Sequence, residues 1–168
     1  MREQLTDTVV VGSGISGLVT ALCLSPGDVT LVSKTQTLLG GSSLWAKGGI
    51  AAAVGPGDSA AAHAEDTLLA GAGLSNAYRA RRLTEEGSSS LEWLIGEGIL
   101  FDRDANGELE LAREAAHRYP RVVHAGGDAT GLALVEGLVA RVEETPGVHI
   151  RENAFAYDLV VRRNEIQG

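Results

Sequence analysis

Residues 8–33 read TVVVGSGISGLVTALCLSPGDVTLVS, and this stretch decides the fold. The run Thr8–Val11 predicts a buried strand, residues 18–24 continue at helical spacing, and Val29–Val32 predicts a second strand. Between the first strand and the helix stands GSGISG, residues 12–17, which has the Gly-x-Gly-x-x-Gly spacing. This order is typical of a βαβ unit that binds a dinucleotide.

Each glycine of this fingerprint has its own expected role. Gly12 permits the tight turn, Gly14 lets the backbone approach a pyrophosphate, and Gly17 brings the helix close to the strand. The start of the helix adds free N–H groups and the positive end of the helix dipole. An ordinary glycine-rich turn is the alternative, but the placement between a strand and a helix favours dinucleotide binding.

The end of the second strand bears on the choice of dinucleotide. An NAD site commonly has an acidic residue there that holds the ribose. This chain has Ser33-Lys34 instead, with no Asp or Glu nearby. Lys34 either neutralises phosphate charge and covers the adenosine, or is a solvated loop residue, and the spacing does not decide between the two.

Composition excludes several classes of protein. The chain has 168 residues, of which 44% are hydrophobic and 21% charged, as in a globular domain. Its net charge of −8 argues against nucleic acid or an anionic membrane surface as partner. The single cysteine, Cys23, is expected in the core of a protein from a reducing compartment. No signal sequence or membrane-spanning run is recognised, so the cytoplasm is the expected location.

The rest of the chain alternates irregular and regular segments. Residues 34–57 are too irregular for one element, whereas residues 59–98 predict helices that begin at the caps Ser59 and Asn76. In the first of these helices Asp66 is expected away from the apolar face. The pair Asn106-Gly107 predicts a hairpin turn.

The last third of the chain predicts a helix over 131–144 and strands over 148–151 and 155–162. Residues 164–168 resemble a hairpin turn that lacks its return strand, which would leave unpaired edge groups. We therefore expect the chain to be a piece of a longer protein. We also expect the piece on its own to self-associate or to rely on partner chains, and to bind a dinucleotide weakly or not at all.

The segment 40–52, GGSSLWAKGGIAA, follows the second strand. Paired glycines at both ends would let main-chain amides press against a flat ring, and its serines offer hydroxyl groups. Trp45 could cover such a ring or simply pack in the core.

With the fingerprint, Ser33-Lys34, this segment and Asp128-Ala-Thr-Gly131 in this order, the chain resembles the flavoproteins of the succinate dehydrogenase and fumarate reductase superfamily. Within it, the L-aspartate oxidases are most similar. The resemblance implies an α/β, Rossmann-like FAD-binding domain with the βαβ unit at the N-terminus and an incomplete sheet. Residues 1–168 would form the N-terminal part of that domain, with a capping or substrate domain and a C-terminal helical domain beyond residue 168.

The resemblance also implies the cofactor and its contacts. Ser42 stands where the respiratory dehydrogenases have a histidine that links covalently to the flavin, so the FAD is expected to be non-covalent. Lys47 replaces the family's usual glutamine. The residues expected to bind FAD are Gly12, Ser13, Gly14, Ile15, Ser16, Gly17, Lys34, Ser42, Ser43, Leu44, Trp45, Ala46, Lys47, Gly48, Gly49, Phe155 and Ala156.

One carboxylate is implicated in substrate binding. The cluster Arg113–Arg118 would by itself be read as a solvated loop, with His124 as a structural histidine and no metal site. The resemblance implies that Glu114 orients the substrate by facing the amino group of aspartate. Ala115-Ala116 replaces the family's glycine pair, which makes the loop stiffer.

The implied reaction is oxidation of L-aspartate to iminoaspartate, with oxygen or fumarate as acceptor. It would feed quinolinate and NAD biosynthesis and imply a functional link to quinolinate synthase. The catalytic arginines are expected beyond residue 168, so the piece alone should be inactive. Three alternatives remain: a fumarate reductase or succinate dehydrogenase flavoprotein, a non-catalytic dinucleotide-binding module, and a pyridine-nucleotide enzyme, which the missing acidic ribose ligand disfavours.

Overall fold

The computed structural model describes residues 5–162 and 165–166. The chain divides into two compact units. Unit 1 comprises Met1–Ala46 and Leu134–Gly168, and unit 2 comprises Lys47–Ala133. We describe each unit by itself.

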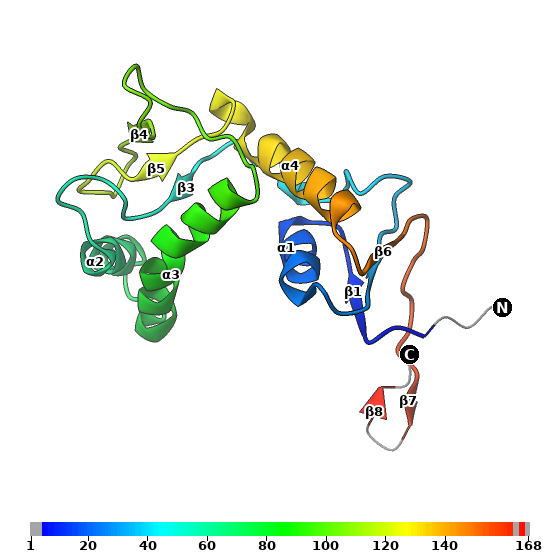
Figure 1. The fold of residues 1–168 in the computed structure, drawn as a ribbon. Helices are drawn as coiled ribbons and strands as arrows, with labels where there is room; N and C mark the ends of the chain where they lie inside the picture. The colour runs from blue at the N-terminus through cyan, green and yellow to red at the C-terminus, as the bar shows by residue number, and fades with distance from the viewer. Residues whose placement is uncertain (1–4, 163–164, 167–168) are drawn as a thin grey trace. The chain divides into compact units, whose positions relative to one another are not determined.

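Unit 1 contains the βαβ motif that the sequence predicts (Figure 1). The elements are β1 (Thr8–Val11), α1 (Ile15–Leu24) and β2 (Val29–Val32). A third strand, β6 (Val148–Arg151), completes a parallel sheet of order β1-β2-β6. The apolar side chains Val10, Leu18, Ala21, Val29 and Leu31 are buried. Their burial fixes α1 on the sheet and so places the glycine loop at the ends of the strands.

Helix α4 (Thr130–Glu144) confirms the helix expected over 131–144. It begins in unit 2, and its larger part, from Leu134 onward, belongs to unit 1. Its apolar residues recur at helical spacing and are buried: Leu134, Val135, Leu138 and Val142.

Two expectations for unit 1 are wrong. Strand β1 is buried only at Val10, because it lies at the edge of the three-stranded sheet and the side chains of Val9 and Val11 are 50% and 61% exposed. Cys23 is exposed and is not a core residue. Leu18 and Ala21 form the buried face of α1, and Cys23 lies two positions beyond Ala21, toward the opposite side of the helix.

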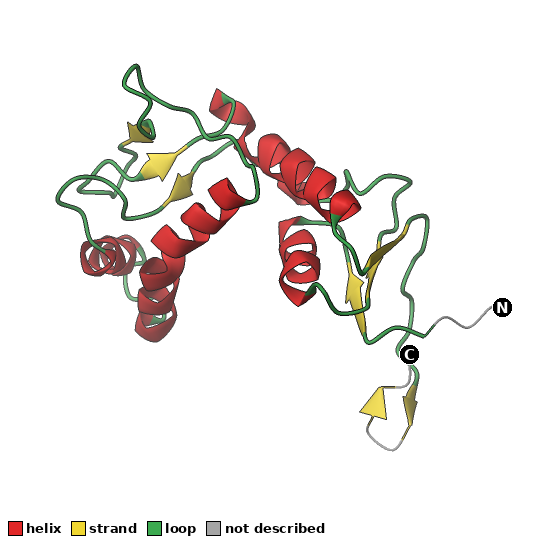
Figure 2. Cartoon of the chain, in the orientation of Figure 1, coloured by secondary structure: helices red, strands yellow, loops and turns green. Residues whose placement is uncertain are grey.

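Unit 2 combines a small antiparallel sheet with two helices. The sheet has the order β3-β5-β4, with β3 (Ile50–Ala51), β4 (Leu111–Ala112) and β5 (Val122–Val123). The helices, α2 (Ala60–Ala70) and α3 (Ala77–Gly96), are drawn in red in Figure 2.

Both helices of unit 2 begin at the predicted caps. The Ser59 Oγ accepts a hydrogen bond from the Ala62 N–H at 3.1 Å, and the Asn76 Oδ1 accepts one from the Arg79 N–H at 3.0 Å. The predicted turn at Asn106-Gly107 is also confirmed, since Gly107 has a φ of +85° and Arg103 pairs with Leu109 across it. Short 3-10 helices lie at Ser42–Trp45 in unit 1 and at Gly127–Ala129 in unit 2.

The expected strand over 155–162 is wrong for most of its length. Only Val161–Arg162, as β7, is a strand, and it pairs with β8 (Glu165–Ile166). The hairpin therefore has the return strand that the sequence was expected to lack. Residues 155–160 have no strand neighbour among the described residues, and without hydrogen-bonding partners an apolar run does not become a strand. Asn164, Gln167 and Gly168 lie outside the described residues.

Candidate functional site

The glycine loop has the backbone geometry that its spacing predicts. Gly12 has a φ of +108°, which only glycine adopts readily, and its N–H donates to the Val32 carbonyl at 2.9 Å. A Cβ on Gly17 would overlap the carbonyl oxygen of Gly12, so α1 approaches β1 more closely than a side chain would allow. Gly14 is the N-cap of α1 and has no side-chain capping bond. The first-turn N–H groups of α1 have no intrahelical acceptor, as at every helix start, and that of Ile15 donates to Ser43 Oγ.

A cavity of about 210 Å³ opens at this loop, entirely within unit 1. It is lined by the loop, by the end of β2 and by two further segments: Val11, Gly12, Ser13, Gly14, Val32, Ser33, Lys34, Thr35, Gly40, Gly41, Ala154, Phe155 and Ala156. The structure thus brings Phe155 and Ala156 to the glycine loop although they are not in a strand. Lys34 lies at the same cavity with an exposed side chain.

The cavity suits a phosphate-bearing group. The hydroxyl groups of Ser13 and Ser33 lie 3.0 Å apart and both residues are buried. The Ser43 Oγ accepts from the Ile15 N–H at 3.4 Å, which ties the 3-10 helix Ser42–Trp45 to the start of α1. A dinucleotide pyrophosphate needs N–H donors, a helix N-terminus and a backbone free of side chains, and all three are present here.

The expected flavin segment is divided between the two units. Ser42, Ser43, Leu44, Trp45 and Ala46 belong to unit 1. The side chain of Trp45 is 81% exposed and does not pack in a core.

Lys47, Gly48 and Gly49 belong to unit 2, where Lys47 is exposed. A Cβ on Gly49 would overlap the Val123 carbonyl oxygen and would lie 3.0 Å from His124 Nε2. Only glycine therefore fits at position 49, against β5.

Glu114 lies in the loop 113–121, which joins β4 to β5. Its carboxylate is half-exposed, and its Oε1 lies 3.4 Å from His124 Nε2. Gly49, His124 and Glu114 are thus neighbours in unit 2. Gly49 is the last residue of the expected flavin-binding segment, and Glu114 is the carboxylate expected to face the substrate. The two lie close together although they are 65 positions apart in the sequence.

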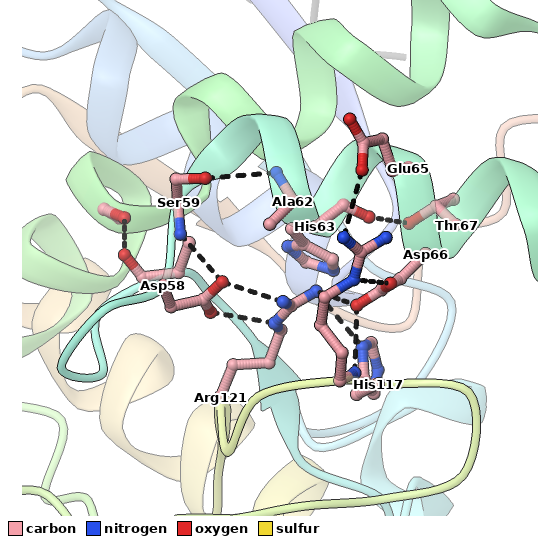
Figure 3. Close-up of polar contacts among 12 residues, drawn as sticks. Asp58, Ser59, Ala62, His63, Glu65, Asp66, Thr67, His117 and Arg121 are labelled. Carbon is pink, nitrogen blue, oxygen red and sulfur yellow. Dashed lines mark hydrogen bonds and ion pairs between the residues drawn. The ribbon is translucent and has the colours of Figure 1, made fainter.

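Sequence reasoning missed the most strongly buried charged group, Arg121. Its side chain is fully buried, and its Nη2 and Nε contact the two carboxylate oxygens of Asp58 at 2.7 and 2.8 Å (Figure 3). Its Nη1 contacts Asp66 Oδ2 at 3.1 Å and His117 Nδ1 at 3.4 Å. The only local signal is an arginine directly before an apolar strand, and nothing local shows its partners on residues 58 and 66.

Asp66 is buried, which its expected place away from the apolar face of its helix does not predict. Its side chain is 5% exposed because arginines from a distant loop surround it. Burial alone would raise the pKa of Asp66, but hydrogen bonds from Arg118 and the charges of Arg118 and Arg121 outweigh burial and lower it. In return, the hydrogen bond to Asp66 raises the pKa of Arg118. The ion pair between Asp66 and Arg118 is therefore charged at neutral pH.

His63 borders the same network on α2. Burial and the neighbouring charges of Arg121 and His117 lower the pKa of His63, so the imidazole is neutral at pH 7. Its ring meets that of His117 edge-on with centroids 5.4 Å apart.

The described part of the chain holds no group of three or more His, Cys, Asp or Glu side chains suited to a metal ion. No helix in residues 5–162 has the length and apolarity needed to cross a membrane.

Curated relatives are similar to the chain over most of its length. The chain is 47% identical over 156 residues to L-aspartate oxidase 1 of Ralstonia nicotianae, covering 92% of the chain and 29% of that protein. It is 46% identical over 155 residues to L-aspartate oxidase of Streptomyces coelicolor, covering 92% of the chain and 27% of that protein. The chain thus spans less than a third of the length of these relatives.

Solved structures show the same fold. The Sdh1 complex of Mycobacterium smegmatis in the apo form matches with a TM-score of 0.84 at 28% identity, over 96% of the chain and 30% of the matched chain. The quinol fumarate reductase of E. coli matches with a TM-score of 0.90 at 23% identity, over 100% of the chain and 29% of the matched chain. The resemblance to flavoproteins of the succinate dehydrogenase and fumarate reductase superfamily, including the L-aspartate oxidases, is confirmed.

A family model described as "FAD binding domain" matches residues 7–168 and supports FAD as the cofactor. The chain belongs to the FAD binding domain family.

Proposed function

We propose that this chain supplies the dinucleotide-binding part of an enzyme that oxidises L-aspartate to iminoaspartate with FAD. The observation that carries the proposal is the group formed by Glu114, His124 and Gly49 in unit 2. The relatives named L-aspartate oxidase are 39–47% identical to the chain, whereas the respiratory enzymes among the solved structures are 21–28% identical. The closer likeness favours the amino acid as substrate over a plain dicarboxylate.

In this proposal each part of the chain has a defined task. The glycine loop and the start of α1 bind the pyrophosphate, and Phe155 and Ala156 bound the adenosine side of the cavity. FAD supplies the two-electron acceptor for the oxidation. Glu114 places a negative charge opposite the substrate ammonium group, which a dicarboxylate without an amino group does not need. This selects aspartate over succinate.

We further propose that the FAD is held without a covalent bond. The resemblance places Ser42 at the position of the flavin-linking histidine, and a serine hydroxyl has no ring nitrogen for such a link. Acid precipitation of the full-length protein should therefore release all of its flavin into the supernatant. The absorbance of the washed pellet measures what remains. Flavin that stays with the pellet would contradict the proposal.

Replacement of Glu114 by glutamine in the full-length protein should separate the two substrates. Loss of an ion pair in a closed site costs about 2–5 kcal/mol, so kcat/KM for L-aspartate should fall by a factor of about 30 or more. Fumarate reduction should be unchanged or improved, since fumarate has no amino group. Steady-state assays with both substrates give the comparison.

Glu108→Gln is the matched control, because Glu108 is an exposed carboxylate of the same unit in the hairpin before β4. It should leave both activities at the wild-type level. Equal losses of both activities in Glu114→Gln would mean that the loop is only structural.

A further inference from the structure

The loop that carries Glu114 is fixed by the sheet at both ends. It leaves β4 at Ala112 and enters β5 at Val122, and these two residues are partners in the antiparallel register. The Arg121 N–H also donates to the Ala112 carbonyl at 3.1 Å. Between these points the loop forms no helix or strand, and within it the His117 N–H donates to the Glu114 carbonyl at 3.2 Å. Other contacts must set its path.

Asp58 pairs with Arg121, Glu65 of α2 pairs with Arg118, and three further contacts converge on Asp66 of α2. The backbone N–H of Arg118 donates to Asp66 Oδ2 at 3.0 Å, and the Arg118 Nε donates to Asp66 Oδ1 at 2.6 Å. The Arg121 Nη1 reaches Asp66 Oδ2 at 3.1 Å. One buried carboxylate thus holds a backbone N–H and two side chains of the segment 118–121. Figure 3 labels Asp66 and Arg121.

The loop backbone also contains strain that needs such restraint. Ala116 has a φ of +69°, a left-handed conformation that costs a residue with a side chain free energy. A strained residue keeps its conformation only where its surroundings fix it. The turn at Glu114–His117 directly precedes Arg118, whose backbone N–H and side chain both bind Asp66. The contacts of Asp66 therefore hold the strained turn in place.

We propose that Asp66 is a positioning residue for substrate binding: through Arg118 and Arg121 it holds the turn that aims Glu114 beside His124. In the part of the chain that the structure describes, Asp66 forms no hydrogen bond or ion pair with Glu114 itself. The inference rests on the proposed function, because it assumes that Glu114 faces the substrate ammonium. It adds that specificity for an amino acid depends on a carboxylate of α2, 48 residues before Glu114 in the chain.

The test is Asp66→Asn in the full-length protein with bound FAD. Asparagine keeps the shape of the aspartate side chain but carries no negative charge. Its amide N–H₂ group also replaces one acceptor oxygen, so one arginine N–H loses its acceptor. Misplacement of a substrate-orienting group by about 1 Å can cost up to about a hundredfold in rate, so KM for L-aspartate should rise at least about tenfold. Fumarate reduction and the flavin content should stay at the wild-type level.

A double-mutant cycle with Glu114→Gln shows whether Asp66 acts through Glu114. If it does, Asp66→Asn should add nothing to the aspartate KM of Glu114→Gln. Additive effects, or equal losses for aspartate and fumarate, would overturn the proposal. Absence of aspartate oxidation in the wild-type holoenzyme would instead overturn the proposed function, so the two failures are distinguishable.

Arg118→Gln keeps the test valid if Asp66→Asn does not fold. Its side chain is 43% exposed, and the variant retains the backbone bond to Asp66 while losing the side-chain ones. It should raise KM for aspartate in the same direction and spare fumarate reduction. Arg82→Gln is the control, because it removes an exposed ion pair with Glu86 on α3 and should change neither activity.

Discussion

Replacement of Arg121 by methionine should destabilise unit 2 more than any other single loss of charge in the described chain. Methionine fills a similar volume but leaves the fully buried Asp58 carboxylate without its cation. Removing one partner of a buried ion pair typically costs about 3–5 kcal/mol. Hydrogen exchange of the amides in residues 111–123 of the full-length protein measures this loss as a lower free energy of opening.

Two further variants separate the charge effect from packing. Asp58→Asn added to Arg121→Met should restore part of the lost stability, because it removes the uncompensated charge. Arg82→Met breaks an exposed ion pair with Glu86 and should cost less than about 1 kcal/mol. If Arg121→Met lowered the free energy of opening as little as Arg82→Met does, the ion pairs of Arg121 with Asp58 and Asp66 would be screened by water. They would then not hold the loop.

The parts of the fold that follow local rules are predictable from the sequence. The βαβ unit, the caps Ser59 and Asn76 and the turn at Asn106-Gly107 depend on residues close together in the chain. The strand expected over 155–162 is wrong for most of its length because strand formation depends on a partner that the local sequence does not show. Its apolar pattern is correct for a strand, but a strand also needs a neighbour, and only Val161–Arg162 has one.

In the candidate site, too, local features could be predicted from the sequence and tertiary contacts could not. The glycine loop could be placed from its spacing, and the structure brings Phe155 and Ala156 to it. Arg121 and the burial of Asp66 could not be predicted, because an ion pair between residues 55 positions apart leaves no periodic signal. A lone Asp within a helix is ordinarily solvated, and only the tertiary fold supplies the arginines that offset its burial.

Gly14→Val should abolish FAD binding while leaving the fold intact. The backbone at Gly14 is extended, with φ −73° and ψ 172°, a conformation that valine adopts readily. A Cβ there would meet only Ser43 Oγ, at 3.5 Å, which is an ordinary contact. The new side chain would instead occupy the space at the start of α1 that a pyrophosphate must approach. We expect purified full-length Gly14→Val to be colourless, with FAD affinity reduced at least about a hundredfold.

Two other glycines test whether the loss is specific to the cofactor. Gly17→Ala would place a Cβ into the Gly12 carbonyl, so it should destabilise the fold as well as lose flavin. Gly96→Ala, at the end of α3, meets nothing within 4 Å and should keep both fold and flavin. A folded Gly14→Val protein that retains stoichiometric FAD would refute the assignment of the glycine loop as the pyrophosphate site. Circular dichroism and the flavin-to-protein absorbance ratio together distinguish these outcomes, because only Gly14→Val should lose the flavin without losing the fold.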